Sequence, residues 1–89
     1  MAATYWNGTA SAQVKGGPGL LVGAVVSSSP TDAGVVTLRD GGATGAILAT
    51  LRVAAGSTVV LCPALAVAFS QLYVKKEAGT TVEMTVFYV

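Results

Sequence analysis

The amino-acid sequence predicts an all-β fold, either a small antiparallel β-sandwich or a jelly-roll-like barrel of about seven to eight short strands. Val, Thr, Tyr and Phe are abundant, and apolar residues alternate with polar ones in several short segments. Turn signals built from Gly, Pro, Ser and Asp separate these segments at intervals of about 8–12 residues. The alanine-rich stretch at residues 64–68 is too short for a stable helix, and the 89-residue chain has no room for the long crossovers of a parallel sheet.

The first segment, residues 1–12, is expected to be an N-terminal arm in front of a sandwich domain at residues 13–89. It mixes small residues with the adjacent aromatics Tyr5 and Trp6 and keeps no sustained strand period. Two large rings on a loose chain end would leave much apolar area in water. The arm is therefore expected either to dock on a neighbouring subunit or to fold back on its own domain.

The first half of the sandwich contains two predicted strands. A glycine- and proline-rich turn at residues 16–19 leads into an apolar run at 20–26. A polar loop follows, and then residues 34–40 alternate so that Val36 and Leu38 share one face. Val35, Thr37 and Arg39 are expected on the other face.

The clearest alternation lies in residues 47–53, after a sharp turn signal at Asp40-Gly41-Gly42. The residues expected on its core face are Ile47, Ala49, Leu51 and Val53. The opposite face carries Leu48, Thr50 and Arg52 and is expected to lie mostly in water.

A charge-free stretch, residues 53–74, has the length of a membrane-spanning helix. Pro63 falls at its middle, where the proline ring and the missing N–H disrupt a helix interior. The stretch is therefore interpreted as two short buried strands, at residues 57–61 and 65–69, with a turn around Pro63.

The end of the chain contains two further strands. Residues 71–76 alternate, and a tight turn is expected at residues 77–79. The final strand lies at residues 80–89, and its expected core face consists of Val82, Met84, Val86 and Tyr88.

The composition removes most kinds of chemistry. The sequence has no histidine and one cysteine, Cys62, so neither a Ser-His-Asp nor a Cys-His site can be built. Cys62 precedes a proline in an apolar run, which favours a buried and inert thiol. The glycine-rich turns lack phosphate-binding spacing. We therefore expect no enzymatic activity, no catalytic residues, no cofactor and no bound metal.

The few charged residues are interpreted as turn and surface groups. The formal net charge of +1 is too small to favour a nucleic acid or an anionic membrane as partner. The groups weighed and set aside as acid-base or nucleic-acid sites are Asp32 with Asp40, Glu77 with Glu83, and Lys75 with Lys76.

The strongest functional indication is apolar area that one copy cannot bury. Five basic and four acidic residues are few for the surface, and both the run at residues 20–26 and the final strand are apolar on two faces. A strand buried on both faces of a small sandwich needs a second subunit over one of them, so we expect an obligate oligomer. The candidate interface residues are Tyr5, Trp6, Leu20, Leu21, Val22, Phe87 and Val89.

Two segments resemble a known family. Residues 35–51, VVTLRDGGATGAILATL, resemble the hairpin "VTLYDG…SG…LLATI" of small β-sandwich proteins encoded among the structural genes of tailed bacteriophages. Residues 72–89, with LYV at the start and GTTVEMTVFYV at the end, are similar to their close, "GLYV…TGGTADVTVYY". One departure is Arg39, which stands where the family commonly has an aromatic residue.

The resemblance implies a non-enzymatic virion structural protein, a head decoration or cement protein. Such a protein sits as a homotrimer on the capsid surface and stabilises the shell by bridging copies of the major capsid protein. It would be made in the host cytoplasm and located on the virion, with neither nucleic acid nor membrane as partner.

Two other classes remain open. A fibre-associated or tail-associated carbohydrate-binding or adhesion module would use the same sandwich, with Tyr73, Tyr88 or Trp6 as a stacking platform. A small membrane-associated protein is the other hypothesis, and it rests on the charge-free apolar stretch at residues 53–74.

Overall fold

The computed structural model describes residues 3–63, 65–78 and 81–89, and it confirms the predicted fold class. Within these residues the regular structure is all strand, in two antiparallel sheets packed as a sandwich. The strands are β1 (Thr4–Gly8), β2 (Ala12–Lys15), β3 (Gly19–Ser28), β4 (Gly34–Asp40), β5 (Ala46–Val53), β6 (Thr58–Leu61), β7 (Val67–Phe69), β8 (Leu72–Ala78) and β9 (Val82–Tyr88).

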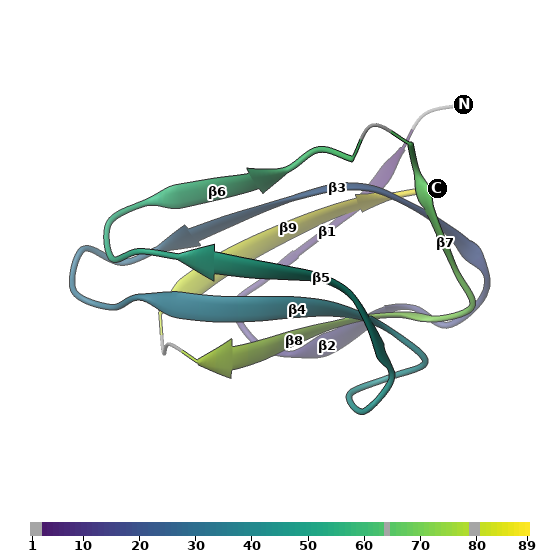
Figure 1. The fold of residues 1–89 in the computed structure, drawn as a ribbon, viewed down its shortest axis with the longest axis horizontal. Coiled ribbons are helices and arrows are strands. Elements are labelled where there is room, and N and C mark those ends of the chain that lie inside the picture. Colours follow the sequence, from purple (N-terminus) through teal and green to yellow (C-terminus); the bar gives the residue numbers. More distant parts are fainter. Residues whose placement is uncertain (1–2, 64, 79–80) are drawn as a thin grey trace.

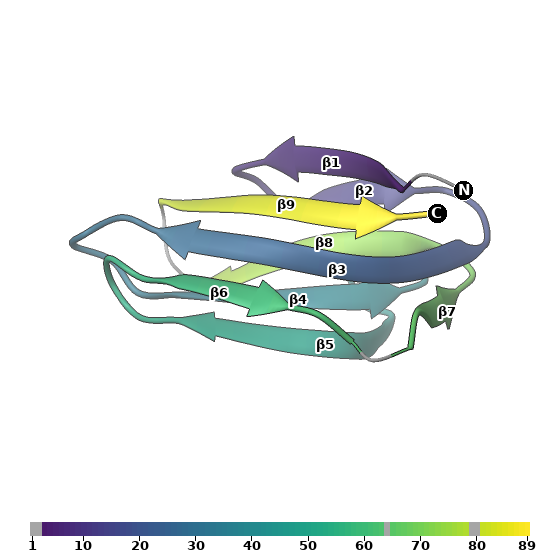
Figure 2. The ribbon, with the colours of Figure 1, turned by 90° about the horizontal axis from the view of Figure 1, so that it is seen from above.

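The strand order is that of a jelly roll. Sheet A has the order β1-β9-β3-β6, with β7 also paired to β3, and sheet B has the order β2-β8-β4-β5. Figure 1 shows the two sheets as stacked layers, and Figure 2 shows sheet A in front of sheet B. Strand β1 pairs with β9, β2 with β8, β3 with β6 and β7, and β4 with β5, all antiparallel. The chain is thus one long antiparallel ribbon, nested around the β4–β5 hairpin and rolled over two layers.

The core lies between the sheets and is built from alternate residues of the long strands. This confirms the periods predicted for β4, β8 and β9, and the bounds of β4 are those expected from the sequence. A fully buried aliphatic side chain contributes about 1.5–3 kcal/mol relative to an exposed one, so this layer supplies most of the stabilisation. The buried apolar residues are Leu21, Ala24, Val26, Val36, Leu38, Leu51, Val53, Phe69, Leu72, Val74, Val82, Met84 and Val86.

The β4–β5 turn depends on glycine, as its sequence predicts. Gly41 and Gly42 have φ angles of 100° and 113°, in the region that side chains with a Cβ rarely adopt. Gly45 lies so close to the Asp40 carbonyl that a Cβ would collide with it. The tight return of the chain therefore needs these three positions without side chains.

The apolar stretch at residues 53–74 forms strands, as expected, but the expected burial is wrong: no residue of β6 is buried, and Leu65, which precedes β7, is 83% exposed. Strands β6 and β7 lie one after the other along β3, on either side of Pro63. Ala64 lies outside the described residues. In the part of the chain that is described, no helix is long and apolar enough to cross a membrane.

The predicted arm at residues 1–12 differs from the structure. Residues 4–8 form β1, which pairs with β9 from Thr4 opposite Tyr88 to Gly8 opposite Met84. Ala12 begins β2 on the other sheet. The sequence did not reveal β1 because a short edge strand buries few side chains and leaves no apolar period; Met1 and Ala2 lie outside the described residues.

Two smaller differences concern strand ends. A register shift in the β4–β5 ladder leaves Ile47 exposed and lets Leu48 pack against the core, although Ile47 was expected inside. Strand β8 continues through Ala78, past the start of the turn expected at residues 77–79; Gly79 lies outside the described residues.

Candidate protein interface

The outward surface of sheet A has an apolar end formed by four strands. Tyr5 on β1 lies opposite Phe87 on β9, and Phe87 lies opposite Gly23 on β3. Two residues beyond Gly23 on β3, Val25 lies opposite Val60 on β6. Tyr5 is 67% exposed and Val60 is 64% exposed. We call this surface the sheet A patch and define it by Tyr5, Leu20, Val22, Val25, Val60, Cys62 and Phe87.

A shallow apolar hollow of about 220 Å³ lies within the patch. It sits over Gly23, which has no side chain to fill it. A Cβ at this position would lie 3.0 Å from the Leu61 carbonyl oxygen, so the close approach of β3 and β6 favours glycine here. The side chains around the hollow belong to Val22, Val25, Val60, Cys62 and Phe87.

The structure places four of the seven predicted interface residues in the patch, all of them exposed: Tyr5, Leu20, Val22 and Phe87. Val89 is half-buried, and its backbone exchanges two hydrogen bonds with Leu20, at 2.9 and 3.0 Å. This exchange holds the chain end against the start of β3.

The other two predicted interface residues face inward. Leu21 is a core residue, 1% exposed, so it cannot contact a second subunit. Trp6 is half-buried opposite Val86 and packs against the core, with its ring over Gly8. Alternation along a strand explains both corrections, since the neighbour of an outward residue points to the core.

The predicted interface residues did not include three members of the patch, Val25, Val60 and Cys62. Val60 and Cys62 lie in the stretch that was interpreted as buried strands. The Cys62 side chain is exposed, so the expectation of a buried thiol is wrong. Strand β6 does alternate, with Val59 half-buried and Val60 exposed, but two adjacent valines hide that alternation from the sequence.

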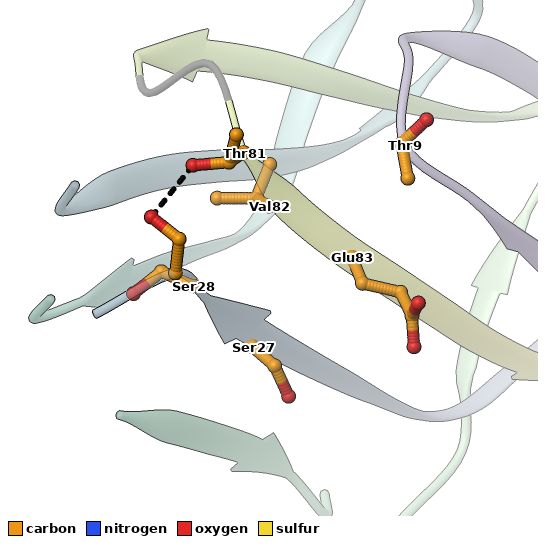
Figure 3. A pocket seen from close by; sticks show the side chains of 7 residues that line it. Thr9, Ser27, Ser28, Thr81, Val82 and Glu83 are labelled. Atoms are coloured by element: carbon orange, nitrogen blue, oxygen red, sulfur yellow. Dashed lines mark hydrogen bonds between the residues drawn. The ribbon is translucent and has the colours of Figure 1, made fainter. Parts of the chain in front are cut away.

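The other end of the same surface is polar (Figure 3). Asn7 donates a hydrogen bond to Thr85 at 2.7 Å, and the hydroxyls of Ser27 and Thr58 lie 3.0 Å apart. A second hollow, of about 520 Å³, lies beyond them and is lined by Thr9, Ser27, Ser28, Ser29, Thr81, Val82 and Glu83. Sheet A therefore changes from apolar to hydroxyl-rich along its strands.

The outward surface of sheet B carries charge. Arg39 donates hydrogen bonds to Glu77 at 3.1 Å and to the Gly45 carbonyl at 3.0 Å, and the Lys75 ammonium lies 3.5 Å from Glu77. Desolvation by itself would raise the pKa of Glu77, but the hydrogen bond from Arg39 and the positive charge of Lys75 outweigh it and lower that pKa. Interface centres are depleted of charged groups, so sheet A is the better candidate interface.

Glu77→Gln is expected to lower the free energy of unfolding slightly near neutral pH and to have no effect in acid. Because the folded-state pKa of Glu77 lies below its ordinary value of 4.5, this carboxylate stabilises the fold above that value. The contribution is lost as the pH falls through the folded-state pKa. Urea unfolding across a pH series measures the difference, with Glu83→Gln on sheet A as control. A difference that stays constant at all pH values would contradict the role of the charge.

Three further charged groups, Asp40, Asp32 and Lys76, make local hydrogen bonds. Asp40 accepts two backbone N–H groups at 2.9 and 3.0 Å, and Asp32 accepts a hydrogen bond from the Thr81 hydroxyl at 3.0 Å. Lys76 donates to the Thr9 carbonyl at 3.1 Å. Among the described residues no three His, Cys, Asp or Glu side chains gather in a way that would hold a metal ion.

The three rings considered as a carbohydrate-stacking platform are not brought together. Tyr73 lies on sheet B, opposite Arg39. Trp6 packs against the core at the β1 edge. Tyr88 is half-buried, with its ring centroid 6.0 Å from the ammonium of Lys15. No shared aromatic surface results from these positions.

Comparison with known proteins bears on the fold. No protein-family model and no curated protein matches the chain. The structure is similar to a solved structure described as "Bacillus endospore appendages form a novel family of disulfide-linked pili", with a TM-score of 0.55. The similarity covers 98% of this chain and 84% of that chain, at 17% sequence identity. At this identity the likeness extends to the fold alone.

Proposed function

We propose that this protein is a non-enzymatic structural subunit that assembles with copies of itself through the sheet A patch. The observation that carries the proposal is a single outward surface on which β1, β9, β3 and β6 all present apolar side chains, with Tyr5 and Val60 about two-thirds exposed at 67% and 64%. Exposed apolar surface of this kind marks interaction sites. No member of the patch is charged, whereas Arg39, Lys75 and Glu77 lie on the opposite sheet.

We further propose that the assembly is a homotrimer on the capsid surface of a tailed bacteriophage, where it binds the major capsid protein as a head decoration protein. Its support is the resemblance of residues 35–51 and 72–89, which form the β4–β5 hairpin and the β8 and β9 strands. Jelly rolls are common among viral capsid domains. The solved structure of similar fold is described as pili, so this fold also occurs in a protein named for a repeating assembly. In this proposal the protein is made in the host cytoplasm, and it requires neither nucleic acid nor membrane.

Co-sedimentation with phage heads that lack a decoration protein tests the finer proposal. The purified protein is expected to pellet with the heads and to reach a saturating ratio to the capsid protein. Free heads and free protein, centrifuged separately, are the controls. Protein that self-associates but stays in the supernatant at every concentration would overturn the capsid assignment and leave the self-association intact.

A second candidate function is carbohydrate binding, and the hydroxyl-lined hollow of sheet A favours it. Serine and threonine hydroxyls and the Glu83 carboxylate line that hollow and offer donors and acceptors for a sugar. Glycan-array binding that is lost in Glu83→Ala would support this function. A silent array would remove it.

A further inference from the structure

We propose that the copies join edge to edge, with β1 of one copy paired to β6 of the next, so that sheet A continues from subunit to subunit. This inference rests on the proposed self-association and specifies its contact. The partner is a second copy of this chain. The contact is head to tail, because two different edges meet, and such a contact closes into a ring or continues as an open chain.

Strands β1 and β6 are the two ends of sheet A and lie at opposite sides of it (Figure 2). An edge strand exposes unpaired N–H and C=O groups, and proteins usually guard it with charges, prolines or bulges. Neither β1, with sequence TYWNG, nor β6, with sequence TVVL, contains a charge or a proline. The edge strands of sheet B differ, since β2 carries Lys15 and β5 carries Arg52. Sheet A is therefore the sheet with open edges.

The directions of the strands allow this pairing without turning a subunit over. Each neighbour along β1-β9-β3-β6 is antiparallel to the one before it, so β1 and β6 run in opposite directions. When a second copy is displaced sideways by the width of the sheet, its β1 lies beside β6 of the first copy and runs antiparallel to it. Its sheet A patch then continues that of the first copy, and where the head-to-tail contact closes into a ring, the patches turn toward the common axis and cover one another.

One register matches the side chains on both faces of the joined strands. A shift by one residue would exchange the inward and outward faces, so only alternate registers are open. The register that sets apolar against apolar and polar against polar pairs Tyr5 with Val60, Trp6 with Val59 and Asn7 with Thr58. An aromatic residue opposite a β-branched one is a favourable cross-strand pair.

The same register places Tyr5 of one copy at the rim of the apolar hollow of the other copy. Val60 of that other copy lies directly opposite Tyr5, and its Cys62 lies on the diagonal, within reach of the aromatic ring. Both side chains line the hollow over Gly23. A symmetric contact between two β1 strands would leave this hollow empty, so the hollow favours β6 as the partner edge.

The natural cysteine makes the contact testable by cross-linking. In this register Ala3, which is exposed and precedes β1, lies opposite Cys62 of the next copy. Within one subunit the two positions lie about three strand spacings apart, roughly 14 Å. A disulfide requires Cα atoms within about 7 Å, so a bond between the new thiol of Ala3→Cys and Cys62 can only join two copies.

Mild oxidation of Ala3→Cys, followed by a non-reducing gel, is the experiment. The wild type and Ala3→Cys/Cys62→Ser are the controls, because each has one thiol per chain and gives dimers at most. We expect at least about tenfold more cross-linked product from Ala3→Cys than from either control, with covalent trimer and higher species from Ala3→Cys alone, because pairing holds the two thiols at a high local concentration.

The outcomes separate this inference from the function it rests on. A product that stops at the covalent trimer supports both edge pairing and the homotrimer. A longer ladder supports edge pairing in an open chain and overturns the homotrimer. Dimers alone, from a protein that still self-associates by light scattering, overturn edge pairing and leave the self-association standing. A wild-type protein that is monomeric by the same measurement overturns both.

Discussion

Replacing Phe87 by aspartate is expected to convert the assembled protein into monomers while the sandwich stays folded. Phe87 lies near the centre of the sheet A patch, between Tyr5 and Gly23, and it is 37% exposed in the single chain. The monomer therefore tolerates a carboxylate there. In the assembly the same carboxylate would be buried without a partner, at a cost of about 3–5 kcal/mol. That cost weakens association by more than about a hundredfold.

Light scattering measures the mass of the assembly, and far-UV circular dichroism measures whether the sandwich stays folded. Thr50→Asp is the matched control, because it adds the same charge to an exposed position on sheet B. The control is expected to keep the mass of the wild type. An unchanged mass for Phe87→Asp, or an equal loss of mass in Thr50→Asp, would contradict the sheet A patch as the interface.

Two adjacent aromatics in β1 are expected to respond in opposite ways to truncation. Trp6→Ala removes a ring that packs against the core and over Gly8, so it should lower the free energy of unfolding by about 2–3 kcal/mol. Tyr5→Ala removes an outward ring and should change the stability of the monomer by less than about 0.5 kcal/mol. It should, however, weaken self-association.

Urea unfolding in a Phe87→Asp background isolates the stability of the monomer, because binding between copies otherwise adds to it. Light scattering of Tyr5→Ala in the natural background measures association. Equal effects of Trp6→Ala and Tyr5→Ala on stability would contradict the orientation of β1, in which Trp6 faces the core and Tyr5 faces outward. A Tyr5→Ala protein that associates like the wild type would remove Tyr5 from the interface.

The sequence was sufficient for the strands that bury one whole face. The alternation of β4 places Val36 and Leu38 on one face, and that of residues 71–76 and of β9 places Leu72 and Met84 inward; all four are buried. Such strands can be predicted from their own segment, since the inward residues are apolar and most of the outward residues are polar. The glycines of the β4–β5 turn were predictable for a similar local reason, because positive φ angles select for glycine.

The sequence was insufficient where tertiary pairing decides the structure. Residues 4–8 have no apolar period, and only their pairing with β9 makes them a strand. Leu20, Leu21 and Val22 are all apolar, so no pattern tells which of them faces the core; the structure buries Leu21 and exposes the other two. Val60 was hidden in the same way, beside a second valine.

The sequence predicted that an apolar interface exists, but it predicted only some of the residues that form the sheet A patch. The excess of apolar residues over charged ones indicates that some surface must be covered, and Phe87 and Val22 are exposed as that reasoning requires. Which strands lie side by side is not written in any single segment. Tyr5 and Phe87 are 82 residues apart in the chain, and the jelly-roll order makes them neighbours.

Self-association through the sheet A patch is best tested by sedimentation equilibrium of the wild-type protein over a wide range of concentrations. A chain of 8.8 kDa that covers its sheet A patch with other copies should sediment as a multiple of that mass, three times as large for the proposed homotrimer. Its tyrosine and tryptophan fluorescence should show Tyr5 shielded from a soluble quencher. A mass of 8.8 kDa at every concentration, with Tyr5 open to the quencher, would contradict the claim.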